Sequence, residues 1–239
     1  MIDHGRVAVI IPAFNHGVRL SDVVWQVKNL GYPVFVVNDG STDTTAELLA
    51  SMDGITVLEH TVNMGKGEAL VTGFKAATAS CDWAISIDAD GQHKPEDVGC
   101  LLAAVPADQR PIVIGARLGM DGENVPWTSR FGRGFSNFWV WVSGGPLVSD
   151  SQSGFRLYPL PNVLHLDIRS RRFQFEVEVL VKACRAGIPV FEAPVQVVYQ
   201  KGAERISHFH PWRDFLRNSL TFSRLIFGRI FSIFRWRAR

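Results

Sequence analysis

The sequence predicts an α/β fold in which helices flank a mostly parallel sheet and an amphipathic helix lies at the C-terminal end. Three observations support this fold class. Up to residue 115 the chain alternates between short apolar runs and segments of helical periodicity, an order typical of parallel sheets with helical crossovers. With 46% hydrophobic and 20% charged residues, the 239-residue chain has an ordinary globular composition. Residues 202–239 combine arginines with aromatic and aliphatic side chains at helical spacing.

Runs rich in β-branched residues predict the strands, and a helical pattern follows most of them. We expect strands at residues 7–11, 34–37, 56–58, 83–87 and 112–114, and helices at 20–30, 43–52, 68–79 and 95–104. After residue 115 the pattern is looser, with a helix at 173–186 and extended segments at 190–193 and 195–199. Parallel sheets bind ligands at the carboxyl ends of their strands, so polar residues at those ends are the candidates for a site.

The charged residues divide the chain into two regions. Residues 202–239 contain eight arginines and two acidic residues, a net charge of +6, whereas residues 1–201 carry −4. We therefore expect a main domain over 1–201 and a basic tail over 202–239, whose charge favours a polyanionic partner. The three cysteines are widely spaced, and no apolar run is long enough for a signal peptide or a membrane span. These features predict a cytoplasmic protein without a disulfide framework or a zinc site.

Two aspartates follow the strand expected at 83–87. Because side chains alternate across a strand, Asp88 and Asp90 point to the same side where it ends, and the amide oxygen of Gln92 is near them. Such hard oxygen ligands suit Mg²⁺ or Mn²⁺ shared with a phosphate. The alternative is a pair of solvated acids in a turn, but the apolar strand in front of them favours a metal site.

Two further loops carry polar residues after strands. Asp39 can accept hydrogen bonds from a nucleobase edge, or it can belong to a turn and helix cap. Lys66 lies between two glycines just before a helix, where it can contact a phosphate or a base. Neither the P-loop spacing nor a Gly-x-Gly-x-x-Gly after the first strand is present, which weakens ATPase and dinucleotide-dehydrogenase interpretations.

Six short motifs occur in one order along the chain. They are Ile-Pro-Ala-Phe-Asn at 11–15, Val-Asn-Asp-Gly-Ser-Thr-Asp at 37–43, Asn-Met-Gly-Lys-Gly at 63–67, Asp-Ala-Asp-Gly-Gln at 88–92, Ile-Gly-Ala-Arg at 114–117 and Asp-Ser-Gln-Ser-Gly-Phe-Arg at 150–156. Together they resemble the family 2 glycosyltransferases of GT-A fold, in particular the dolichol-phosphate mannosyltransferase and polyprenyl-phosphate glucosyltransferase branch. The resemblance extends over roughly residues 7–200.

The resemblance implies a nucleotide pocket lined by Pro12, Asn15 and Asp39. It also implies that the three metal ligands named above hold a divalent cation on a sugar-nucleotide diphosphate, and that Arg117 helps to neutralise phosphate. Members of this kind invert the anomeric centre by direct displacement. The leaving nucleoside diphosphate needs charge neutralisation, which a metal and arginines supply, so Asp90 is counted among the catalytic residues.

The need for a general base depends on the acceptor. A phosphate is ionised at pH 7 and attacks unaided, whereas a hydroxyl must lose its proton to a positioned carboxylate. Asp150 is the leading candidate for that base, with Glu176 and Glu178 in reserve. Alternatively, Asp150 caps or braces the loop around Gly154.

The acceptor side of the resemblance is less regular. In this branch a Ser-Lys pair tends to follow an arginine after the last core strand, whereas residues 205–209 read Arg-Ile-Ser-His-Phe. Arg205, Ser207 and His208 are therefore expected at an acceptor phosphate, with His in place of Lys. The Gln/Arg-x-x-Arg-Trp element of processive polysaccharide synthases is absent, which favours transfer of a single sugar.

The tail has two faces when drawn as a helix over 213–236. Its arginines at 213, 217, 224 and 235 are separated by nearly whole turns, and the opposite side carries Phe215, Leu216, Phe222, Ile226, Phe227, Ile230, Ile233 and Phe234. Such a helix suits an anionic membrane surface. The alternative is a helix docked on the main domain with its arginines outward. Nucleic-acid binding is not expected, because the basic stripe lacks a binding fold.

These observations predict a metal-dependent, inverting glycosyltransferase. It is expected to move one sugar from a UDP- or GDP-sugar to a lipid acceptor, polyprenyl phosphate or glycolipid, at the cytoplasmic membrane face. One alternative is a sugar-nucleotide nucleotidyltransferase, which would carry a Gly-x-Gly-Thr-Arg loop where residues 12–15 read Pro-Ala-Phe-Asn. The other is a non-catalytic membrane-bound partner of another transferase, which would have no reason to retain a complete set of metal ligands.

Overall fold

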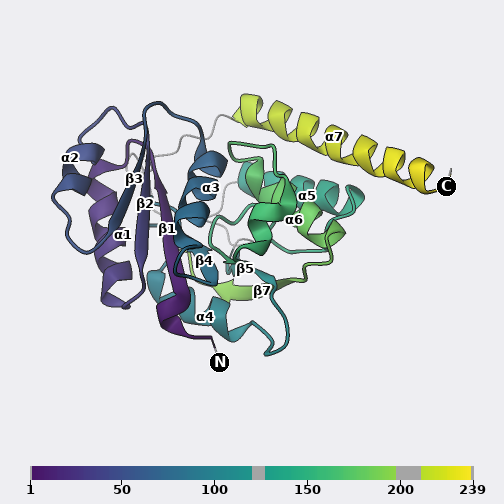
Figure 1. The fold of residues 1–239 in the computed structure, drawn as a ribbon. Coiled ribbons are helices and arrows are strands. Elements are labelled where there is room, and N and C mark those ends of the chain that lie inside the picture. Colours follow the sequence, from purple (N-terminus) through teal and green to yellow (C-terminus); the bar gives the residue numbers. More distant parts are fainter. Residues whose placement is uncertain (1, 120–126, 198–210, 238–239) are drawn as a thin grey trace.

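One mixed sheet forms the centre of the protein (Figure 1). A computed structural model describes residues 2–119, 127–197 and 211–237 of the chain. The strands lie in the order β3-β2-β1-β4-β6-β5-β7. Their bounds are Val7–Ala13 (β1), Val34–Asp39 (β2), Thr56–His60 (β3), Trp83–Ser86 (β4), Ile112–Arg117 (β5), Arg156–Pro159 (β6) and Val190–Val195 (β7). Strand β6 runs antiparallel to β4 and β5, and the other neighbouring pairs are parallel.

Helices cover both faces of this sheet, and the last helix adds a further layer (Figure 1). Short 3-10 turns at His4–Arg6, Pro95–Asp97 and Asn162–Leu166 accompany the α-helices. The α-helices are Gly17–Asn29 (α1), Thr45–Ala50 (α2), Lys66–Ala77 (α3), Val98–Ala103 (α4), Trp127–Val142 (α5), Phe175–Arg185 (α6) and Pro211–Arg237 (α7). The predicted α/β fold with a parallel majority and a C-terminal helix is therefore confirmed.

The alternation of side chains along β1 divides the core in two. Val7, Val9 and Ile11 face the cluster formed with α1, α2 and α4, whereas Ala8 and Ile10 face the cluster formed with α3, α5 and α6. All five side chains are fully buried, as expected of a central parallel strand with both faces covered. Because apolar clusters cover both faces of β1, polar side chains can be accommodated only at the ends of the strand.

Two elements of the second half differ from the sequence-based expectation. Strand β6 was not expected, because its four residues, Arg-Leu-Tyr-Pro, show no apolar run. Helix α5 was not expected as a helix either, because glycines and serines interrupt its aromatic residues. The expected helix at 95–104 divides into a 3-10 turn, Pro95–Asp97, and α4. Tertiary packing therefore decides these elements where local propensity does not.

Helix α7 packs on α5 and α6 through its middle turns. Phe222 and Leu225 are buried in the core cluster, and the Phe222 ring stacks on Trp139 of α5. Arg224 forms a 2.7 Å ion pair with the buried carboxylate of Glu178 on α6. At these turns α7 is docked on the main domain, as in the alternative given above, and Phe222 does not lie on an apolar outer face. The Arg224 side chain remains 42% exposed while it pairs with Glu178. Within the part of the chain that is described, no helix has the length and apolarity needed to cross a bilayer.

Candidate active site

The strand-end residues predicted from the sequence are brought together by the parallel half of the sheet. The first aspartate of the pair, Asp88, comes two residues after β4 ends, and Asp39 is the last residue of β2. The amino-terminal turns of α3 and α6 lie against the same edge, because Glu68 donates its backbone N–H to the carbonyl of Arg171 in the segment before α6. Loops that are distant in sequence therefore share one edge of the sheet, as the parallel topology requires.

Lys66 links three elements at this edge. Its Nζ lies 2.6 Å from Oδ1 of Asp88 and 2.5 Å from Oε1 of Glu176 on α6. The side chains of Lys66, Asp88 and Glu176 are only 14%, 28% and 8% exposed. Burial alone would lower the pKa of Lys66, but the two carboxylates outweigh it, raise the pKa and keep the ammonium charged. Burial would likewise raise the pKa of Asp88, but Lys66 outweighs it and lowers that pKa.

Asp90 lies in a tight turn after β4. Its Oδ1 accepts a hydrogen bond of 3.0 Å from the backbone N–H of Gln92, and its backbone carbonyl accepts one from Arg19. Gly91 has a φ of +69°, a left-handed conformation that glycine adopts without strain. The turn keeps the three predicted metal ligands on one short segment at the end of the strand.

Gly154 leaves room beside the first of these ligands. A Cβ atom at this position would come within 2.5 Å of Oδ2 of Asp88, and it would also collide with Nζ of Lys66. A larger residue at 154, just before β6, would therefore force the Asp88 and Lys66 side chains to shift. Two carboxylates and one amide fit a hard cation whose other ligands are phosphate oxygens and water. Among the described residues, no three His, Cys, Asp or Glu side chains form a metal-binding group of their own.

Asp39 holds the loop that leads into α3. Its Oδ1 accepts hydrogen bonds from Met64 N and His60 Nδ1, at 2.8 and 2.7 Å, and its Oδ2 accepts one of 2.8 Å from Gly65 N. The residue is 2% exposed. These contacts show a loop-bracing role that the sequence did not reveal, while a second lone pair on Oδ2 remains for another donor.

Asn15 joins the loops after β1 and β2. Its backbone has a φ of +54°, its N–H donates to Ser41 Oγ at 3.0 Å, and its side-chain oxygen accepts from Thr42 N at 2.8 Å. Pro12 is a half-buried residue of β1 close to this turn. The three residues expected to line a nucleotide pocket therefore lie at the ends of two adjacent strands.

Arg117 and Asp150 form an ion pair at the end of β5. Arg117 donates from Nε and Nη2 to the two carboxylate oxygens, at 2.6 and 2.9 Å, and Asp150 is 1% exposed. Glu192 accepts hydrogen bonds from the backbone N–H groups of Ser149 and Asp150. Burial alone would raise the pKa of Asp150, but the Arg117 guanidinium outweighs it and lowers the pKa. These contacts make Asp150 a brace for Arg117, a partner other than the expected loop around Gly154, and its role as a general base stays a prediction.

His93 is a site residue that was not predicted. It follows Gln92, is 6% exposed and packs its ring against Phe155, and among the described residues its Nδ1 has no hydrogen-bond partner. Burial lowers the pKa of His93 to about 4 against the opposing charge of Asp88, so the ring is neutral at pH 7. The sequence signal that could have identified His93 is its position directly after the predicted metal ligands at the end of β4.

The two reserve candidates for a base have other contacts. Glu176 is ion-paired with Lys66, as described above. Glu178 accepts hydrogen bonds from the backbone N–H groups of Arg169 and Ser170 and pairs with Arg224 beneath α7. Arg205, Ser207 and His208, expected at the acceptor phosphate, lie outside the described residues.

The order of these strand-end residues agrees with a known family. Residues 8–160 match the model of Glycosyl transferase family 2. The chain belongs to this family. This glycosyltransferase is thus an enzyme that transfers sugar, and neither a nucleotidyltransferase nor a non-catalytic partner.

Relatives of this glycosyltransferase match along most of its length. It is 30% identical to a UDP-N-acetylglucosamine–dolichyl-phosphate N-acetylglucosaminyltransferase of Methanococcus voltae, with 80% of this chain and 85% of that protein covered. It is also 30% identical to a polyprenol monophosphomannose synthase of Mycolicibacterium smegmatis, with 80% and 76% covered. Among solved structures, S. aureus TarS 1-349 has a TM-score of 0.52 at 17% identity, covering 83% of this chain and 59% of that one. This last similarity concerns the fold alone.

Proposed function

We propose that this glycosyltransferase moves a single sugar, with inversion, from a UDP- or GDP-sugar to a polyprenyl phosphate at the cytoplasmic face of a membrane. The observation that carries the proposal is the carboxylate pair Asp88 and Asp90 at the end of β4, with Gly154 leaving space beside it. The acceptor class is supported by the two relatives, whose names specify a dolichyl-phosphate and a polyprenol product.

The chain's own residues supply the positioning that this reaction needs. Asp88, Asp90 and Gln92 would hold a Mg²⁺ or Mn²⁺ ion, which supplies charge neutralisation for the leaving nucleoside diphosphate when bound. Pro12, Asn15 and Asp39 would line the nucleotide side. Lys66 at the start of α3 would contact the diphosphate, because a helix N-terminus and an ammonium both attract phosphate.

Arg117 would help to neutralise the donor diphosphate, with Asp150 holding its guanidinium in place. A phosphate oxygen is already ionised at pH 7 and needs no base, so a braced Asp150 is consistent with this acceptor. A glycolipid hydroxyl would instead require Asp150 to take a proton, which its lowered pKa and its ion pair disfavour. The contacts of Asp150 therefore favour the phosphate over the hydroxyl as acceptor.

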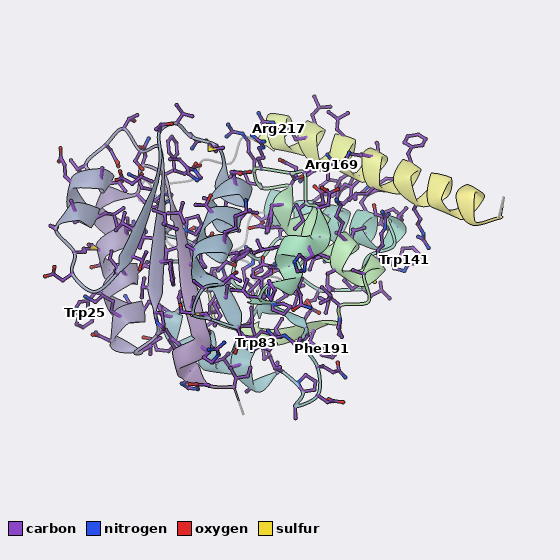
Figure 2. All side chains as sticks on the ribbon, in the orientation of Figure 1. Trp25, Trp83, Trp141, Arg169, Phe191 and Arg217 are labelled. Carbon is purple, nitrogen blue, oxygen red and sulfur yellow. The ribbon has the colours of Figure 1, made fainter. Side chains whose placement is uncertain are left out.

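The membrane face is proposed from exposed apolar side chains on two helices. Leu216, Leu220 and Phe227 of α7 are exposed, as are Phe138 and Trp141 of α5. Figure 2 shows Trp141 near the end of α5, on the side of the molecule along which α7 lies. Apolar side chains beside arginines are the composition of an interfacial surface.

The test is transfer from UDP- and GDP-sugars to a polyprenyl phosphate in detergent, followed by mass spectrometry of the lipid. We expect a glycosylated lipid with Mn²⁺ or Mg²⁺ and loss of product with EDTA. D90N should lower kcat by about a hundredfold or more. The exposed aspartate at 108 provides the control, because D108N removes the same charge without touching the site. Equal turnover with and without EDTA would exclude the metal, and transfer only to a glycolipid hydroxyl would exclude the phosphate acceptor.

A further inference from the structure

The Lys66 ammonium lies against a carboxylate oxygen of Asp88 that a metal cation would need as a ligand. Its ammonium lies 2.6 Å from Oδ1 of Asp88, the first carboxylate of the proposed metal site. A second carboxylate, that of Glu176, lies 2.5 Å from the same nitrogen and is only 8% exposed. One cation of the chain itself is therefore shared between a metal ligand and a buried acid on another helix.

The charge of this cluster explains why the arrangement is stable. Asp88, Asp90 and Glu176 carry three negative formal charges, and Lys66 and Arg19, which donates to the backbone carbonyl of Asp90, carry two positive ones, a net charge of −1. Buried carboxylates of this kind require a cation, because unpaired charge is costly away from water. Lys66 meets this need for Asp88 and Glu176, and a divalent ion would add positive charge to a cluster that is still negative.

A divalent ion and the Lys66 ammonium repel one another at Asp88. Both charges would lie within a few ångströms of the same carboxylate, in a site where charges are poorly screened. Lys66 is anchored at its backbone, since Gly65 before it donates to Asp39 and Ala69 within its helix donates to the carbonyl of Gly65. Its flexible side chain is therefore the part that can move.

We propose that Lys66 is a built-in counter-ion of Asp88, which a divalent cation displaces, and that Glu176 retains the displaced ammonium in the site. This inference rests on the proposed metal-dependent function. The diphosphate of the donor offers the ammonium a new anionic partner and offers the cation further oxygen ligands. Nucleotide and cation therefore promote one another's binding, and the same coupling factor applies in both directions. Without nucleotide, Lys66 keeps the cation affinity low.

The test measures Mn²⁺ binding to the full chain, by the electron paramagnetic resonance signal of unbound Mn²⁺, with UDP, with GDP and without nucleotide. For the wild type we expect at least one nucleotide to raise Mn²⁺ affinity about tenfold or more. In K66M the affinity without nucleotide should rise about fivefold or more, and the effect of nucleotide should shrink. K75M is the matched control, since it removes a lysine from the exposed side of the same helix and should leave both values unchanged.

A second variant, K66M/E176Q, separates the proposed effect from misfolding of K66M and from the change in net charge. K66M alone leaves Glu176 buried without its ion-pair partner, whereas K66M/E176Q removes both charges and keeps the net charge of the protein. The double variant should also bind Mn²⁺ more tightly than the wild type without nucleotide. Equal Mn²⁺ affinity of the double variant and the wild type would overturn the inference and leave the metal site standing. Mn²⁺ binding to none of these proteins, even with UDP or GDP, would overturn the proposed metal site itself.

Discussion

The two halves of the sheet bury different kinds of side chain. In β2, β1 and β4 the buried residues are almost all apolar, and the buried acid Asp39 lies at the very end of its strand. In the second half, fully buried polar groups lie within the structure, among them Arg156 of β6, Asp150 before it and Glu178 of α6. The first half is thus stabilised mainly by the packing of apolar side chains, whereas the second half also depends on hydrogen bonds made by a few buried charged side chains.

The difference follows from the topology of each half. Parallel strands joined by helices satisfy their own backbone groups, so their side chains need only fill space. The second half contains an antiparallel strand, irregular segments and helix α7, and several of their backbone groups bond to charged side chains. Arg156 donates to the carbonyls of Ser151 and Glu176, and Arg185 donates to those of Ser143 and Leu225. Mutations that conserve volume should therefore have unequal effects in the two halves.

The largest difference is expected at two paired strands, β4 and β6. R156M keeps most of the side-chain volume but removes the buried donors to the carbonyls of Ser151 and Glu176, which should cost about 2–6 kcal/mol of unfolding free energy. I85L, on the adjacent strand β4, conserves volume in the apolar half and should cost less than about 1.5 kcal/mol. Urea unfolding of both variants measures the contrast, and equal losses would contradict it.

A smaller effect is expected at the Arg117–Asp150 pair. D150N weakens three hydrogen bonds from Arg117, at its Nε, its Nη2 and its backbone N–H, and should cost about 2–4 kcal/mol of unfolding free energy. As a brace, Asp150 acts through Arg117, so the KM for the nucleotide sugar should rise about tenfold while kcat changes little. A fall in kcat of about a hundredfold or more at unchanged KM would show a general base instead.

The third effect concerns how α7 is held. Burial alone would raise the pKa of Glu178, but hydrogen bonds from Ser170 and Arg169 and the charges of Arg224 and Lys182 outweigh it and lower the pKa. E178Q should therefore cost about 1–3 kcal/mol of unfolding free energy at pH 7. Because the folded pKa is depressed, this stabilisation is complete above the unfolded pKa of about 4.3 and is lost as the pH falls through the folded value.

Urea unfolding at pH 7, 5 and 3 measures this pH dependence. The gap between wild type and E178Q should be widest at pH 7 and should narrow at the lowest pH. E68Q is the matched control, because Glu68 forms a longer pair of 3.7 Å with the exposed Arg171 and is itself more exposed than Glu178, so this pair should contribute about 0–1 kcal/mol. A gap that widens toward pH 3 would contradict the assigned direction of the Glu178 pKa.

The contrast between the halves also explains what the sequence could predict. In the first half, periodicity places Asp39, Asp88 and Asp90 at strand ends, because parallel strands end at one edge and side chains alternate. The pairing of Lys66 with Asp88 and Glu176 was beyond the sequence, because the three residues belong to different elements and only the folded chain brings them together. His93 directly follows Gln92 in the sequence, but its burial against Phe155 depends on the fold.

Helix α7 shows the limit of periodicity more directly. Helical spacing predicted an arginine ridge opposite one apolar face, but Phe222 and Leu216, both assigned to that apolar face, are 2% and 61% exposed. In the structure Phe222 stacks on Trp139 and Arg224 pairs with Glu178. The residues that determine which side of α7 docks lie in α5 and α6, so the pattern within the tail could not predict these contacts. The boundary between main domain and tail at residue 202 stays a prediction, since residues 198–210 are not described.

The smallest effect on stability is expected at the exposed side of α7, where the effect on membrane binding should be clear. Leu216, Leu220 and Phe227 are each more than half exposed, so L216S/L220S/F227S should change the unfolding free energy by about 0.5 kcal/mol or less per site. If these side chains enter a bilayer, affinity for vesicles rich in phosphatidylglycerol should fall about tenfold or more, which flotation measures.

The matched control for this loss lies at the opposite end of the molecule, where Trp25 projects from α1 (Figure 2). Trp25 is also a large apolar side chain, 66% exposed, but α1 covers the other half of the sheet, far from α7. W25S should therefore leave vesicle binding unchanged. Retained binding in the α7 triple variant would show that the outer side of α7 does not meet the membrane. Loss of binding in W25S would instead place the membrane face at α1, on the half of the sheet opposite to α7.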